Sequence, residues 1–200
     1  LSCLKPFLPL HANGVSYRDK AILLSGAIGD GKSTLTASLL SDGFSLLSDD
    51  LAVIRLLRGG FTLEPGIPEL RLWPRSLLNI KSQGVKEEVL YPETSKKRIR
   101  LDGQCLWHFK NERTDLAGIY ILSRKKTGRI YIEGLKEREA FRGILQHLYL
   151  PVISDLKIQS RQFEKAAQLV QRVPVKRLVY PSGFSLLPKV REAILEDLKS

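Results

Sequence analysis

The sequence predicts an α/β fold with a mixed sheet and a helical C-terminal tail. An apolar run at residues 21–24 leads into a glycine-rich turn and then into a helical segment at 33–40. Residues 51–57 and 61–63 have the pattern of a hairpin around Arg58-Gly59-Gly60. Helical periodicity dominates only late in the chain. Strands on both sides of one early helix fit a mixed sheet better than a regular doubly wound sheet.

The other elements of the first quarter are short. Residues 15–17 and 20–25 are predicted strands separated by a turn. The helix that follows them ends near Ser41-Asp42-Gly43, where the glycine can adopt the left-handed conformation of a helix cap. Residues 44–48 then form an apolar strand that ends in Asp49-Asp50.

The remainder of the chain is more irregular at first. Prolines at 65, 68 and 74 predict an irregular segment, followed by a short helix at 75–80 and a strand at 97–101. Residues 117–123 and 129–135 predict a second hairpin. The last part is expected to hold amphipathic helices around 141–148, 163–170 and 188–198, with a strand at 175–179.

The composition indicates one soluble domain. The chain has 200 residues, 43% hydrophobic and 26% charged, which is enough to bury one good core. No apolar stretch approaches the roughly 20 residues of a membrane span. Cys3 and Cys105 offer no disulfide framework and suit a reducing cytoplasm. We therefore expect a single cytoplasmic domain over residues 1–200.

Residues 26–33 form a complete phosphate-binding loop, G-x-x-x-x-G-K-[ST], between the predicted strand and helix. Loop N–H groups and the helix N-terminus supply positive potential for a polyphosphate. Lys32 can reach the β- and γ-phosphates, and the Ser33 hydroxyl can ligate Mg²⁺. The alternative is a glycine-rich turn with a stray lysine, which the strand–loop–helix setting disfavours. The predicted nucleotide-binding residues are Gly26, Ala27, Ile28, Gly29, Asp30, Gly31, Lys32, Ser33 and Thr34.

Asp49 and Asp50 are the second candidate for chemistry. Phosphoryl transfer needs a carboxylate near Mg²⁺, and a hydroxyl acceptor needs a group that takes its proton. Ser-Asp-Asp is also a sequence typical of a turn or a helix cap. Its place after an apolar strand and the loop helix nevertheless favours a functional role. His11 could lie near the aspartates, and Glu69 lies in a proline-bounded loop of the kind that carries metal ligands; composition alone supports either only weakly.

The charge predicts an anionic partner. The net charge is +11 and the pI is near 9.8, with basic clusters at 96–100 and 124–129. No zinc-finger spacing, helix-turn-helix pattern or RNA-recognition aromatic pattern supports nucleic acid. Nucleotide phosphates and an acidic protein surface are the other candidates. The sequence leaves the oligomeric state open, and a homo-oligomer is compatible with it.

The order of these motifs resembles the catalytic domain of HPr kinase/phosphorylase. His11-Ala12, the loop at 26–33, Leu47-Ser48-Asp49-Asp50 and Glu69-Leu70-Arg71 follow one another as they do in that family, and the match covers about residues 8–75. Leu72-Trp73-Pro74 departs from the family's Gly-rich continuation. This trait is more similar to short HPr-kinase homologues, including those similar to lasso-peptide precursor kinases.

The resemblance implies a fold like that of HPr kinase and phosphoenolpyruvate carboxykinase. Residues 8–135 would form the nucleotide-binding core and 136–200 a mainly helical extension. It also implies Mg²⁺- and ATP-dependent phosphorylation of a serine in an acidic protein or ribosomal precursor peptide. Asp50 would be the base, assisted by His11, and Lys32 would contact the transferred group. Ser33, Asp49 and Glu69 would hold the metal, with Arg71 beside Glu69.

Two other functions remain open from the residues. A small-molecule hydroxyl kinase would use the same loop and aspartates, and an enclosed acceptor pocket would favour it. A nucleotide-sensing module would bind ATP without transferring phosphate, and the paired aspartates argue against it. The sequence does not identify the acceptor, the preferred phosphoryl donor or a reverse phosphorylase activity.

Overall fold

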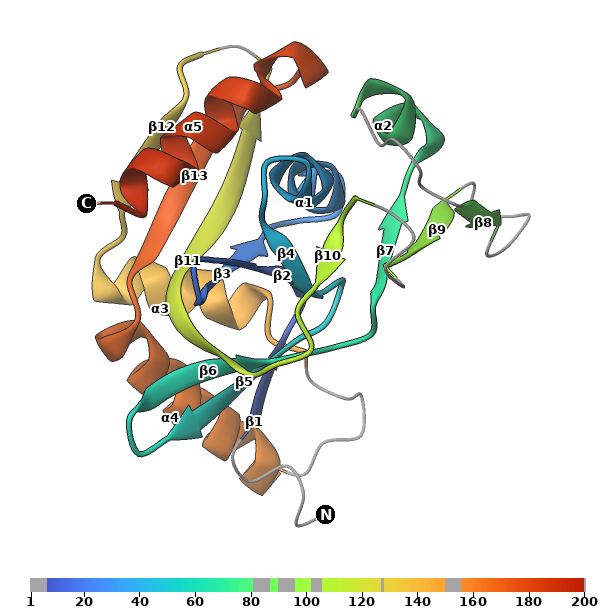
Figure 1. The fold of residues 1–200 in the computed structure, drawn as a ribbon. Helices are drawn as coiled ribbons and strands as arrows, with labels where there is room; N and C mark the ends of the chain where they lie inside the picture. The colour runs from blue at the N-terminus through green and yellow to red at the C-terminus, as the bar shows by residue number, and fades with distance from the viewer. Residues whose placement is uncertain are drawn as a thin grey trace.

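A 10-stranded mixed sheet forms the centre of the fold (Figure 1). The computed structural model describes residues 7–80, 87–89, 96–101, 106–126, 128–149 and 156–199. Its strands are β1 Phe7–Leu10, β2 Ala12–Tyr17, β3 Lys20–Ser25, β4 Ser45–Ser48, β5 Ala52–Leu57, β6 Gly60–Glu64, β10 His108–Phe109, β11 Thr114–Lys125, β12 Tyr131–Gly134 and β13 Val175–Pro181. They follow the order β1-β5-β6-β11-β3-β2-β4-β10, with β13 beside β11 and β12 beside β13. The predicted mixed α/β sheet is confirmed.

A small second sheet and five helices complete the described fold. The second sheet has the order β7-β9-β8, with β7 at Glu69–Leu72, β9 at Lys97–Arg100 and β8 at Glu87–Val89. The helices are α1 Lys32–Leu40, α2 Pro74–Asn79, α3 Glu137–Gln146, α4 Leu156–Arg172 and α5 Leu187–Asp197, and the 3-10 turn η2 at Phe184–Leu186 precedes α5. Among the described residues, no helix is long and apolar enough to span a membrane.

Helices cover both faces of the main sheet (Figure 1). The side chains of β3 alternate between them: Ile22 and Leu24 belong to the core cluster that includes α1 and α5, whereas Ala21 and Leu23 belong to the cluster that includes α3 and α4. A strand buried on both faces has little freedom to shift its register. The loop that leaves β3 at Ser25 therefore starts from a rigid base.

The first predicted hairpin is confirmed and the second is wrong. β5 and β6 pair antiparallel, with Leu57 opposite Gly60 at the turn. β11 and β12 do not pair, because β13 lies between them, parallel to β11 and antiparallel to β12. β13 carries the buried side chains of Leu178, Val179 and Tyr180, which an interior position covers better than an edge.

One further segment differs from the sequence-based expectation. The proline-bounded region holds the strand β7, which pairs with β9 from Glu69↔Arg100 to Leu72↔Lys97. The helices predicted around 141–148, 163–170 and 188–198 correspond to α3, α4 and α5, and the strand predicted at 175–179 corresponds to β13, which belongs to the main sheet.

Candidate active site

The loop Gly26–Ser33 connects β3 to α1. Gly29 and Gly31 have φ values of 93° and 90°, a region that side chains with a Cβ rarely adopt. A Cβ on Gly31 would also lie 3.1 Å from the Tyr180 hydroxyl. Because α1 begins at Lys32, its first free N–H groups face this loop. The loop thus lies at a helix N-terminus whose free N–H groups can bind an anion.

Contacts within the loop hold its shape. The Asp30 carboxylate accepts a hydrogen bond from the Ala27 N–H at 2.7 Å. The Lys32 ammonium donates to the carbonyls of Gly26 at 2.8 Å and Ala27 at 3.2 Å. Burial is the main cause that lowers the pKa of Lys32, and the charges of Asp50 and Asp30 oppose this shift. Lys32 is therefore a buried cation whose charge the loop itself partly compensates.

Strands β11 and β13 support the loop from outside it. The Tyr180 hydroxyl donates to the Asp30 carbonyl at 2.5 Å. Arg124 donates from Nη1 to the Gly29 carbonyl at 3.0 Å and from Nε to the Ser182 hydroxyl at 2.8 Å. The sequence interpretation placed Arg124 only in a basic cluster and did not single out Tyr180. Only the pairing of β11 with β13 brings the two side chains together.

Asp50 lies in the turn after β4, with an unusual backbone. Its φ is 62°, which costs a residue with a Cβ of the order of 1 kcal/mol. Arg71 Nη1 lies 3.4 Å from Asp50 Oδ2, and the Asp50 side chain is 34% exposed. His11 Nδ1 lies 3.0 Å from the Asp50 main-chain oxygen. His11 Nδ1 thus contacts the backbone of Asp50 and not its carboxylate.

Both carboxylate oxygens of Asp49 accept hydrogen bonds. Asn13 Nδ2 donates to Oδ1 at 2.7 Å, and the Arg71 N–H donates to Oδ2 at 2.8 Å. Burial first, and then the charge of Asp50, raise the pKa of Asp49 to about 7, while Arg71 opposes the shift. Asp49 therefore links β2 and β7, and its protonation changes near neutral pH.

This pKa predicts a pH-dependent stability. The usual pKa of an aspartate is about 4, so between pH 4 and 7 the folded protein holds a proton that the unfolded chain has lost. The free energy of unfolding therefore falls as the pH rises through this window. Asp49→Asn resembles the protonated form, so its melting temperature relative to the unaltered protein should rise by a few degrees between pH 5 and pH 8.

Thermal denaturation without nucleotide at the two pH values measures this difference. Asp115→Asn, at an exposed position in β11, serves as the control and should show no such trend. A constant offset between Asp49→Asn and the unaltered protein would contradict the raised pKa.

A cavity of about 1010 Å³ collects most of the predicted site residues. His11 and Asp50 line it together with Lys32, Ser33 and Thr34. The loop positions Ile28, Gly29 and Gly31 also line it, but Asp49 does not. The hydroxyls of Thr34 and Ser76, which also line the cavity, lie 2.9 Å apart and join α1 to α2.

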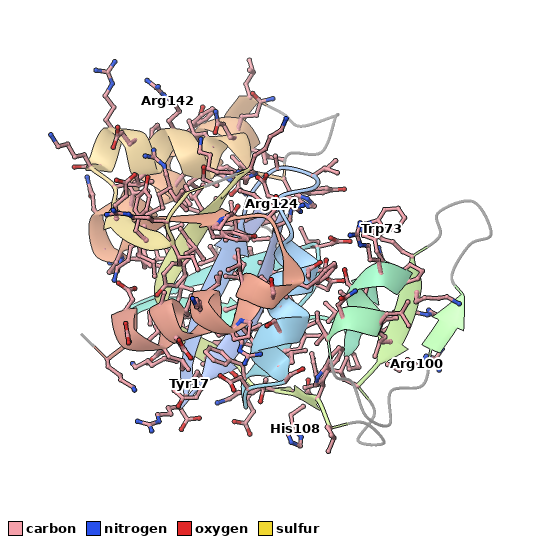
Figure 2. All side chains as sticks on the ribbon, turned by 90° about the horizontal axis from the view of Figure 1, so that it is seen from above. Tyr17, Trp73, Arg100, His108, Arg124 and Arg142 are labelled. Carbon is pink, nitrogen blue, oxygen red and sulfur yellow. The ribbon has the colours of Figure 1, made fainter. Side chains whose placement is uncertain are left out.

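Besides Tyr180, the cavity lining contains the aromatic residues Trp73 and Phe184, which the sequence interpretation did not assign to the site. Trp73 is 51% exposed and has the Lys96 ammonium 5.7 Å from its ring centroid. Phe184, in η2, has the Arg75 guanidinium 5.8 Å from its ring centroid. Figure 2 shows Trp73 beside α2 and Arg124 nearer the middle of the view, over the main sheet. The cavity therefore extends beyond the loop Gly26–Ser33.

Glu69 occupies a different environment from the other predicted metal ligands. Its carboxylate lies 3.4 Å from Arg98 Nη1 and 3.8 Å from Arg100 Nε, and it is not a cavity residue. In the described part of the chain, no three His, Cys, Asp or Glu side chains are grouped to hold a metal. Ser33 does line the cavity, and its hydroxyl oxygen fits Mg²⁺, which needs only one or two protein ligands beside phosphate oxygens.

His147 is a further residue near the site that the sequence interpretation missed. Its carbonyl accepts the His11 N–H at 2.7 Å. Burial, followed by the charges of Lys32 and His11, lowers the pKa of the His147 imidazole. No sequence pattern marks it, because the pairing of residues 147–149 with β1 is a long-range contact.

Of three comparisons with known proteins, the one with solved structures bears on the fold. No family model matches the sequence, and no curated protein matches it. Among solved structures, the HPr(Ser) kinase/phosphatase from Coxiella burnetii is similar, with a TM-score of 0.51 and 12% sequence identity over 95% of each chain. The chain therefore has a fold similar to that of HPr kinase/phosphatase.

Proposed function

We propose that the protein is a kinase that transfers the γ-phosphoryl group of ATP to a serine hydroxyl of a protein or ribosomal precursor peptide. The observation that carries the proposal is one cavity that joins the phosphate loop to Asp50. A donor held by the loop would therefore face a carboxylate that can take a proton. The fold similarity to a protein named HPr(Ser) kinase/phosphatase supports the same reaction class.

The donor side consists of the loop and the start of α1. Loop N–H groups and Lys32 bind the β- and γ-phosphates, and the Lys32 ammonium exchanges its bonds to the Gly26 and Ala27 carbonyls for phosphate oxygens. Ser33 is the cavity residue that would hold Mg²⁺, with Asp49 and Glu69 as further predicted ligands; the ion supplies charge neutralisation when bound. Arg124 and Tyr180 keep the loop in place.

On the acceptor side, Asp50 removes the proton. The serine oxygen forms a bond to the γ-phosphorus as the bond to the β-phosphate oxygen breaks, and the serine proton passes to Asp50. ADP leaves with the electron pair of the broken bond. Arg71 orients the Asp50 carboxylate, and His11 holds the main chain of that residue. Positioning and electrostatics thus provide most of the catalysis.

The aromatic walls of the cavity support a nucleoside triphosphate as the donor rather than pyrophosphate. A triphosphate alone needs only the loop, whereas the cavity extends to Trp73 and Phe184. An aromatic ring stacks on any base, with a contribution of about 1–3 kcal/mol per base. The cations Lys96 and Arg75 beside the rings also suit a polyanionic ligand.

Removing one ring tests the donor class. Phe184→Ala is expected to weaken Mg-ATP binding about tenfold, because it removes one stacking partner. Binding of inorganic triphosphate should change less than about twofold. Isothermal titration calorimetry measures both affinities, and Tyr131→Ala, an exposed aromatic position on β12, serves as the control. Equal weakening of both ligands would instead indicate damage to the phosphate loop.

The acceptor is proposed to be acidic. The net charge of the chain is +11, and Arg71, Arg75 and Lys96 lie at or beside the cavity. An acidic segment next to the serine would be attracted to these cations, whereas nucleic acid finds no recognised binding motif in the chain.

Mass spectrometry tests the function. The protein is incubated with Mg-ATP and peptides encoded by neighbouring genes, and each peptide is examined for an added phosphate on serine. Phosphate on a serine of one peptide, absent with Asp50→Asn, supports the proposal. Transfer only to small hydroxyl compounds in the same mixture would indicate the small-molecule kinase.

A further inference from the structure

One buried side chain, Asn13 on β2, contacts both aspartates of the site. Its Nδ2 donates to Asp49 Oδ1 at 2.7 Å and to the Thr36 hydroxyl of α1 at 3.1 Å, and its Oδ1 accepts the Asp50 N–H at 3.2 Å. Asn13 is fully buried. The Asn13 side chain thus makes three hydrogen bonds, two through its N–H groups and one through its carbonyl oxygen.

The Asp50 backbone needs external support. At a φ of 62° its conformation is unfavourable for a residue with a Cβ. Asn13 Oδ1 binds the N–H of Asp50, and His11 Nδ1 lies 3.0 Å from its carbonyl. Both peptide groups that flank the Asp50 side chain are therefore held from one short stretch of chain, His11 to Asn13. Strained backbone persists where neighbouring contacts determine it in this way.

The same amide links the acceptor side of the site to the donor side. Thr36 lies in the helix that begins at Lys32, so the bond from Asn13 to Thr36 ties the aspartate turn to the phosphate-loop helix. The distance between the donor phosphates and the Asp50 carboxylate then depends on this link. Misplacement of reacting groups by about 1 Å can lower a rate about a hundredfold.

We propose that Asn13 is the positioning residue that holds Asp50 in its left-handed conformation and at a fixed distance from the phosphate loop. The inference rests on the proposed function, in which Asp50 is the base. Only an amide of this length provides two donors and one acceptor here. Aspartate in its place would lose both donors and set a third carboxylate against Asp49, whereas serine would keep at most one donor.

The first test measures the hydrogen bond from the Asp50 N–H to Asn13 directly and needs no kinase activity. In Asn13→Ser, amide hydrogen exchange at Asp50, followed by NMR, is expected to be at least about tenfold faster, because the N–H loses its acceptor. Exchange in the interior of β3 and the affinity for Mg-ATP should stay within about threefold. Asn111→Ala, at an exposed position outside the cavity, serves as the control. Unchanged exchange at Asp50 would overturn the proposal.

The second test uses the backbone strain. Asp50→Gly relieves the cost of the positive φ, so Asn13→Ala should lower the melting temperature less in the Asp50→Gly background than alone. Equal losses in both backgrounds would mean that Asn13 stabilises the fold without holding Asp50. Asn13→Ser replaces Asn13→Ala if the latter does not fold.

The third test concerns the rate. With an acceptor peptide that the unaltered protein phosphorylates, Asn13→Ser should lower kcat at least about tenfold and change KM for ATP by less than about threefold. A rise in KM at constant kcat would contradict a positioning role. If the unaltered protein phosphorylates no peptide, the proposed function fails. The exchange and stability tests still show whether Asn13 holds the backbone of Asp50.

Discussion

Asp50→Asn is expected to bind Mg-ATP with nearly unchanged affinity and to transfer phosphate at least about a hundredfold more slowly. Asparagine has the shape of aspartate and tolerates the left-handed backbone, so the turn and its bonds to Asn13 and His11 should remain. It cannot accept the serine proton. Transfer of radiolabelled phosphate to an acceptor peptide, with calorimetry for ATP binding, measures the two effects separately.

Asp19 offers a matched control for this substitution. It also has a φ of 62°, but it lies in the β2–β3 turn and pairs with Lys110 outside the cavity. Asp19→Asn makes the same chemical change at the same backbone geometry and should leave transfer unchanged. If Asp50→Asn retained near-normal transfer, the assignment of the base would be wrong. Loss of ATP binding in Asp50→Asn would indicate that the carboxylate supports the donor instead.

The early elements of the fold could be predicted because their determinants are local. The apolar run of β3, the glycines after it and the start of α1 are consecutive in the sequence. The β5–β6 hairpin likewise closes over Arg58-Gly59, with its partners a few residues apart. Local patterns suffice where the contacting residues are also neighbours in the chain.

The second hairpin could not be predicted correctly because its competitor lies far along the chain. β11 and β12 have alternating patterns and a short connection, which favour a hairpin. The more apolar β13 pairs with both, from Ile119↔Val175 on one side and Tyr131↔Val179 on the other. β7 was missed for a different reason: Pro68 and Pro74 flank it without entering it, so they do not interrupt its pairing with β9.

Part of the candidate site could also be predicted from local sequence patterns. Lys32, Ser33 and Asp50 follow from linear motifs, and the cavity brings them together. Arg124, Tyr180 and His147 reach the site through strand pairing and a long-range turn, which leave no mark in the local sequence. The sequence does contain one indication of the role of Asn13: it is an amide among the small and apolar residues of β2. A buried amide in such a strand needs hydrogen-bond partners.

Lys32→Ala is expected to weaken Mg-ATP binding by about tenfold to a hundredfold and to lower turnover as well. A charge-assisted hydrogen bond contributes about 1.5–3 kcal/mol, and the alanine removes the only buried lysine of the described chain. The fold should survive, because burial already lowers the pKa of Lys32 and so makes its charge costly to keep. Calorimetry with a non-hydrolysable ATP analogue measures binding, and thermal denaturation measures stability.

Lys20→Ala provides the control, because Lys20 begins β3, at the end of that strand away from the loop, and pairs with Asp115 at the surface. It removes an equal charge from the protein, so any long-range effect of net charge on ATP binding appears in both variants. A specific loss with Lys32→Ala alone would identify the loop as the phosphate site. Equal ATP affinities of the two variants would mean that the nucleotide does not contact Lys32. The proposed position of the donor would then be wrong, even if the protein bound ATP elsewhere in the cavity.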